Sequence, residues 1–93
     1  MRTIKLTRNF KRDYRREQSG VLAKKLNDLL IEATELLAAD LPLLAHHRDH
    51  APAGEWKDCR DCHIRPDLIL IYRFVGVEQL ELVRLGSQSE LGL

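Results

Sequence analysis

An apolar, β-branched run, Leu68-Ile-Leu-Ile-Tyr-Arg-Phe74, is typical of a central β-strand. Pro66-Asp67 marks a turn before it, and we expect an earlier strand from Trp56 to Ile64. Gly76 marks the next turn, after which the alternating stretch from Gln79 to Leu85 predicts a third strand. The C-terminal half is therefore expected to form three antiparallel strands connected by hairpins.

The N-terminal half combines one short strand with two helices. Arg2 to Leu6 alternates polar and apolar residues, which predicts a strand with Ile4 and Leu6 on one face. Thr7 or Asn9 can cap a helix that runs to about Ser19, and Gly20 is a natural stop. Phe10 and Tyr14, four residues apart, give this helix a thin apolar stripe.

A second helix is predicted from about residue 21 to Ala39, because apolar residues recur there at helical spacing. These residues are Val21, Leu22, Leu26, Leu29, Leu30, Ala33, Leu36 and Leu37. Pro42 ends the segment, since the residue before a proline avoids the helical conformation. The predicted fold is α+β: an N-terminal strand, an antiparallel two-helix hairpin on one face, and three antiparallel strands forming one sheet.

Length and composition indicate a single domain that covers residues 1–93. Apolar residues make up 44% of the chain and charged residues 31%, which is ordinary for a soluble protein. No apolar run approaches the ~20 residues of a membrane span, and no export leader is recognisable. Two cysteines three positions apart cannot build a disulfide framework. We therefore expect a cytoplasmic protein that does not contact a membrane.

The net charge of +1 conceals a strongly uneven distribution. Residues 1–25 contain nine lysines and arginines against Asp13 and Glu17, a net charge of +7. Residues 26–55 contain Arg48 against six acidic residues, a net charge of −5. A basic segment of this kind can bind nucleic acid or an acidic protein partner, and it can also be merely a solvated helix face.

The segment Cys59-Arg-Asp-Cys62-His63 matches the haem-attachment pattern. Its context argues against haem, because the cysteines lie in a strand-like stretch and Met1 is the only methionine. Zinc is a second interpretation, but alternation along a strand would point the two thiolates to opposite faces. We expect no haem, no metal and no other cofactor.

Several motifs resemble the YafQ branch of the RelE toxin superfamily. They are Arg48-Asp-His50, Gly54-x-Trp56, Arg60-Asp61-x-His63, Pro66-Asp67 with the apolar strand that follows, and Arg84-Leu-Gly-Ser87. The resemblance covers essentially the whole chain. It implies a toxin of a type II toxin–antitoxin system that cleaves mRNA on the translating ribosome and is held inactive by a cognate antitoxin.

The resemblance also implies roles for individual residues. His50, His63 and Asp67 match residues that the family uses in acid–base catalysis, and Arg84 matches the arginine that holds the scissile phosphate. RNA cleavage without a metal needs a base, an acid and cations, and histidine and arginine suit these tasks. Arg60 and Arg65 are further candidates for binding the substrate. Without the resemblance, His63 and Asp67 could equally be hydrogen-bonding residues of a hairpin.

Two positions depart from the family pattern. Gln88 stands where the family usually has a histidine, and Gly92 stands where it usually has a phenylalanine. Glutamine does not titrate near neutral pH, so Gln88 at the catalytic site predicts slower cleavage. The alternative from another class is a non-catalytic toxin that resembles the ParE branch and binds DNA gyrase; such a protein would not need His50, His63 and Asp67 together.

Overall fold

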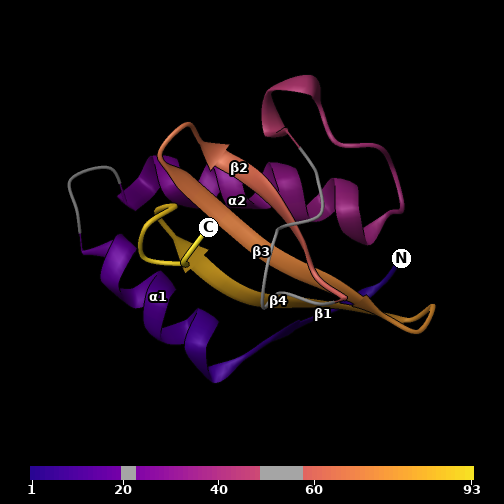
Figure 1. The fold of residues 1–93 in the computed structure, drawn as a ribbon. Coiled ribbons are helices and arrows are strands. Elements are labelled where there is room, and N and C mark those ends of the chain that lie inside the picture. Colours follow the sequence, from indigo (N-terminus) through magenta and orange to yellow (C-terminus); the bar gives the residue numbers. More distant parts are fainter. Residues whose placement is uncertain (20–22, 49–57) are drawn as a thin grey trace.

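The computed structural model describes residues 1–19, 23–48 and 58–93. The elements are β1 (Thr3–Leu6), α1 (Arg8–Gln18), α2 (Ala23–Ala38), the 3₁₀ helix η1 (Ala45–His47), β2 (Arg60–Arg65), β3 (Leu68–Val75) and β4 (Gln79–Gly86) (Figure 1). This order confirms the predicted fold. Gly20, which was expected to end the first helix, and Trp56, the expected start of the earlier strand, lie outside the described residues.

The four strands form one sheet in the order β1-β4-β3-β2. β2 pairs with β3 and β3 with β4 in the antiparallel sense, as predicted. β1 pairs with β4 in parallel, so the sheet is mixed rather than wholly antiparallel. Short turns force neighbouring strands to be antiparallel, whereas β1 is separated from its partner by most of the chain and has no such constraint.

One face of the sheet carries the main core. Apolar side chains at helical spacing on α2, among them Leu26, Leu30, Ala33 and Leu37, are buried against it. They pack in one cluster with Phe10 of α1 and with sheet residues Cys62, Leu70, Tyr72, Leu80, Leu82 and Leu85. In Figure 1, α2 lies behind the sheet, which places the other face towards the viewer.

The other face is covered by the C-terminal segment. Leu91 is buried against Ile69 and Ile71 of β3, and Leu93 packs on the same cluster. Figure 1 shows this segment folding back over the sheet after β4. The sequence pattern predicts the helices on one face but does not indicate this second, smaller core.

Thr7 fixes the beginning of α1 and ties it to the sheet. Its Oγ1 accepts a hydrogen bond from the Phe10 N–H at 3.0 Å, which makes Thr7, rather than Asn9, the cap. The same hydroxyl donates to the Val83 carbonyl of β4 at 2.7 Å. The start of α1 is therefore held against the second half of β4.

β1 is the edge strand and remains accessible. Ile4 and Leu6, which were expected to share a face, are 41% and 45% exposed. Leu6 borders an apolar groove with Phe10, Tyr14 and Ile31. Among the described helices, none has the length and apolar character that crossing a membrane requires.

Candidate active site

The register of the sheet places His63 and Arg84 on the same face. One row of paired residues runs His63–Ile69–Gly86, and the next runs Asp61–Ile71–Arg84. Paired residues project to the same side, as do alternate residues along β3. His63 and Arg84 therefore lie on the face opposite α2, on the two strands that flank β3.

His63 lies in a cavity at the end of β2. The cavity, of about 210 Å³, is lined by His46, Arg48, His63, Ile64, Arg65 and Pro66. The register of β2 shifts between His63 and Arg65, a bulge that re-aims the side chains at the end of an edge strand. The result is a small site with two imidazoles and two guanidinium groups, which suits an anionic substrate.

Asp67 and Gln88 both line a second cavity beside the same turn. This cavity, of about 450 Å³, is lined by Pro66, Asp67, Ser87, Gln88, Ser89 and Leu93. Pro66 borders both cavities, so they adjoin around the turn between β2 and β3. The Asp67 side chain is 82% exposed and lies 3.6 Å from Arg65 Nε. Of the predicted site residues, His63, Arg65, Asp67 and Gln88 are thus brought together.

Arg84 projects from β4 and is held by a buried carboxylate. Its Nε donates to Asp13 Oδ2 of α1 at 2.6 Å, and its Nη2 donates to Oδ1 at 3.4 Å. Burial alone would raise the pKa of Asp13, but hydrogen bonds from Arg84 and the Leu85 N–H, with the charges of Arg84 and Arg16, lower it below the ordinary aspartate value. Asp13 was not singled out in the sequence analysis.

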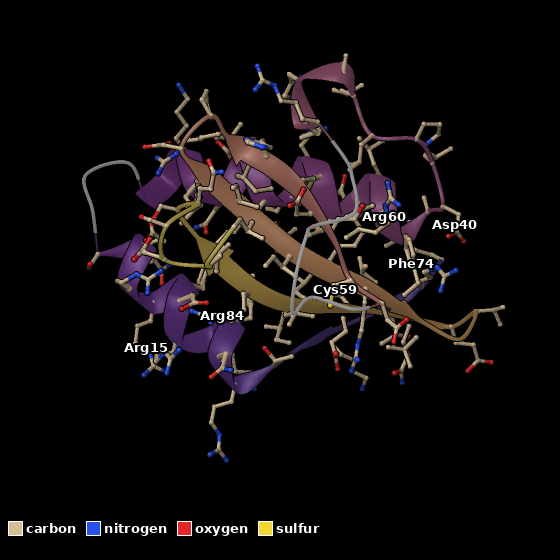
Figure 2. All side chains as sticks on the ribbon, in the orientation of Figure 1. Arg15, Asp40, Cys59, Arg60, Phe74 and Arg84 are labelled. Carbon is tan, nitrogen blue, oxygen red and sulfur yellow. The ribbon has the colours of Figure 1, made fainter. Side chains whose placement is uncertain are left out.

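Two predicted site residues do not join this group in the described structure. Arg60 pairs with Tyr72 and lies two positions before Cys62, and both of these residues belong to the main core. Because residues two positions apart on a strand share a face, Arg60 lies on the face that carries the main core. Figure 2 shows it on β2, well away from Arg84. Arg60 and His63 therefore lie on opposite faces of β2, and substrate binding by Arg60 stays a prediction. His50 lies outside the described residues.

The two cysteines face opposite ways, as alternation predicted. Cys62 is fully buried in the main core, and Cys59 packs against the Ile69–Ile71 cluster on the other face. Burial raises the pKa of the Cys59 thiol, which keeps it protonated near neutral pH. This arrangement excludes a zinc site that uses both thiolates.

Glu32, His46 and His47 place three potential metal ligands within 4.8 Å of one another. The hydrogen bonds argue against metal binding by His47. Its Nδ1 accepts from the Leu44 N–H at 3.1 Å, so in the neutral ring Nε2 carries the proton. That Nε2 lies 3.3 Å from Glu32 Oε1 and serves as a donor to the carboxylate. The cluster is better described as two histidines around one carboxylate.

Helix α1 presents an exposed basic surface beside Arg84. Arg8, Lys11, Arg12 and Arg15 are exposed and form no ion pair within residues 1–19, 23–48 and 58–93. Figure 2 shows Arg15 and Arg84 on the same side of the molecule. The basic charge of the N-terminal segment is therefore available for a partner that carries negative charge.

The chain is similar in sequence and fold to toxins of bacterial type II toxin–antitoxin systems. The sequence model of the family described as "Bacterial toxin of type II toxin-antitoxin system, YafQ" matches residues 2–92. The mRNA interferase toxin YafQ of Escherichia coli strain B / BL21-DE3 is 34% identical over 90 residues, which cover 97% of this chain and 95% of that protein. This chain belongs to the YafQ family of type II toxins.

Solved structures agree with the assignment. A copper-bound mutant toxin from Helicobacter pylori superposes with a TM-score of 0.87 at 36% identity, covering 98% of this chain and 99% of that one. YafQ in the Escherichia coli DinJ–YafQ complex superposes with a TM-score of 0.79 at 32% identity, covering 98% of each chain. The likeness extends over essentially the whole fold, including the strands and turn that carry the candidate site.

Proposed function

We propose that this protein is a ribosome-dependent mRNA endoribonuclease that cleaves by acid–base chemistry without a metal. The observation that carries the proposal is the gathering of His63, Arg65, Asp67 and Gln88 around one turn, with Arg84 on the same face as His63. The Escherichia coli relative named as an mRNA interferase toxin supports the reaction class. Translating ribosomes are in the cytoplasm, where the protein would act.

The reaction divides into three tasks. A base removes the 2′-OH proton, an acid protonates the leaving 5′-oxygen, and cations stabilise the negative charge of the phosphorane. We assign proton transfer to His63 and Asp67, together with His50 on the strength of the family resemblance. Arg84 would hold the scissile phosphate, and Arg65 would contribute a second positive charge beside His63.

Translation extracts supplied with the purified protein test this assignment. We expect mRNA cuts positioned by codon, read by primer extension, and we expect His63→Ala or Asp67→Ala to slow them by ~10²–10⁴-fold. Lys5→Ala, at an exposed position of β1, is the matched control and should cleave like the parent chain. Intact message together with inhibition of DNA supercoiling would instead support the gyrase-binding alternative.

A cognate antitoxin is the proposed partner. The support is the DinJ–YafQ complex of Escherichia coli and the exposed basic residues of α1. We propose that an acidic or amphipathic antitoxin segment binds the α1 surface and restrains the toxin. The test is to coexpress the toxin with the small protein encoded beside its gene and to purify the complex. Arg12→Glu with Arg15→Glu should weaken the complex, while the exposed control Arg73→Glu should leave it intact.

A further inference from the structure

Asp13 is a carboxylate with no exposed surface on an otherwise highly charged helix. Burying a charge is costly unless it is paired, and apolar residues of similar volume often serve stability equally well. Asp13 accepts hydrogen bonds from Arg84 Nε, Arg84 Nη2, the Leu85 N–H and Arg16 Nη1. This coordination is far more specific than anchoring α1 to the sheet requires.

Part of this arrangement has a structural purpose at the edge of β4. β1 ends at Leu6, which pairs with Leu82. Beyond that point, no strand among the described residues pairs with this edge of β4. Asp13 accepts from the Leu85 N–H at 3.1 Å, and Arg16 Nη2 donates to the Leu85 carbonyl at 3.1 Å. Two side chains of α1 thus satisfy the backbone groups that a strand would otherwise satisfy. This purpose accounts for the Leu85 contact but does not require the contact with Arg84.

The contact with Arg84 fixes the direction of the guanidinium group. Asp13 engages Nε and Nη2, the two nitrogens on one edge of the planar fork. The Arg84 side chain is 18% exposed, and within the described residues its Nη1 makes no hydrogen bond. An arginine held by one edge keeps its other donors in a fixed orientation, which is the preorganisation that charge stabilisation needs.

We propose that Asp13 is the positioning residue for Arg84: it holds the guanidinium so that Nη1 and the free donor of Nη2 face the scissile phosphate. The inference rests on the proposed function, in which Arg84 binds that phosphate. Asp13 itself does not touch the substrate. Arg16, which shares Asp13 Oδ1 at 3.3 Å and lies 3.5 Å from Glu90, supports the carboxylate from the side away from Arg84 Nε.

The test compares Asp13→Asn, Arg84→Lys and the double variant in the ribosome-dependent cleavage assay. Asparagine keeps the shape of Asp13 but loses its charge, and lysine keeps the charge of Arg84 but loses its fork. We expect Asp13→Asn alone to lower single-turnover kcat by roughly 10–100-fold with a smaller change in KM. In the Arg84→Lys background the same substitution should change kcat by less than about 2-fold, because the two residues act as a unit.

A spectroscopic measurement separates positioning from mere stability. In the parent protein the Arg84 Nε–H should give a slowly exchanging NMR resonance, identified by its loss in Arg84→Lys. Asp13→Asn should lose this protection while backbone resonances remain dispersed. If Asp13→Asn does not fold, the test uses the parent protein alone. The Arg84 Nε–H resonance should then exchange slowly and should shift when a 2′-O-methylated RNA is added. Rapid exchange of Arg84 Nε–H in the parent protein overturns the proposal.

The outcomes also distinguish this inference from the proposed function. If the parent protein leaves mRNA intact, the proposed function fails, whatever the NMR result. If the parent protein cleaves and Asp13→Asn lowers kcat equally in the parent background and in the Arg84→Lys background, Asp13 acts independently of Arg84 and the inference is wrong. Arg84→Lys with parent-like kcat would likewise contradict it, because a fork would then be unnecessary.

Discussion

Asp67 and Gln88 line the same cavity, although one belongs to the turn between β2 and β3 and the other follows β4. The antiparallel pairing of β3 with β4 brings these two segments to one end of the sheet, where Ile69 pairs with Gly86. Ser87 and Glu90 then brace the C-terminal segment: the Ser87 N–H donates to Glu90 Oε1 at 2.9 Å, and Ser87 Oγ accepts from the Glu90 N–H at 3.2 Å. Position 88 is therefore held beside a candidate catalytic carboxylate.

The Gln88→His variant should cleave faster than the parent chain. An imidazole beside Asp67 can donate or accept a proton near neutral pH, which an amide cannot do. We predict at least a ~10-fold increase in the single-turnover cleavage rate. Ser89→His, which places an imidazole in the same cavity one position later, is the control and should give a smaller gain. Equal rates for parent and Gln88→His would mean that position 88 is structural.

Arg65 and Arg60 should behave differently when replaced. Arg65 borders the His63 cavity, whereas Arg60 lies on the core face of the alternating β2 strand. Removing Arg65 takes one positive charge from the place where phosphate charge develops, so Arg65→Ala should reduce kcat/KM by about 10-fold or more. Arg60→Ala should stay within about 3-fold of the parent value after correction for any loss of folded protein. A larger effect at Arg60 would show that this residue contributes to cleavage although it lies on the core face of β2.

Transition-metal removal should leave cleavage unchanged. The proposed chemistry uses histidine, aspartate and arginine, and the hydrogen bond from the Leu44 N–H to His47 Nδ1 opposes metal binding at the Glu32, His46 and His47 cluster. Phenanthroline added in excess, with Mg²⁺ maintained for the ribosome, should change the rate by less than about 2-fold. A marked loss that zinc or copper restores would contradict the assignment, and His46→Ala would show whether this cluster is responsible.

The elements and much of the site follow from local patterns in the sequence. The spacing of Leu26, Leu30, Ala33 and Leu37 identifies α2, and the Pro66-Asp67 turn places His63 near Asp67. Such signals act between residues a few positions apart. The parallel pairing of β1 with β4 and the cover that Leu91 provides depend on distant contacts, and no local pattern specifies them.

The Asp13–Arg84 pair shows the same limit, since 71 positions separate its members. One signal in the sequence could have indicated it. Asp13 lies on α1 between Phe10 and Glu17 and next to Tyr14, so it occupies the apolar stripe that faces the sheet. An acidic residue on a buried stripe requires a cation from elsewhere in the fold. The sequence does not indicate which of the fifteen lysines and arginines pairs with Asp13.

Acid should destabilise the protein through Asp13. Its pKa in the folded protein lies below the ordinary value of about 3.9 that applies to the unfolded chain. The unfolded state therefore binds more protons in that range, and the stability due to Asp13 is complete above the unfolded pKa. It is lost as pH falls through the lower, folded pKa. Hydrogen bonds from Ser87 also lower the pKa of Glu90, which adds a smaller loss of the same sign.

Urea unfolding followed by tryptophan fluorescence from about pH 6 to about pH 2 measures this dependence. The midpoint should fall steeply below about pH 4 in the parent protein. Asp13→Asn should unfold at lower urea near neutral pH but show a shallower decline in acid, because asparagine does not titrate. Asp67→Asn is the matched control: its carboxylate is largely exposed, so its removal should leave the acid decline unchanged. Parallel pH profiles for the parent and Asp13→Asn would show that the buried ion pair does not contribute to stability above the acid range.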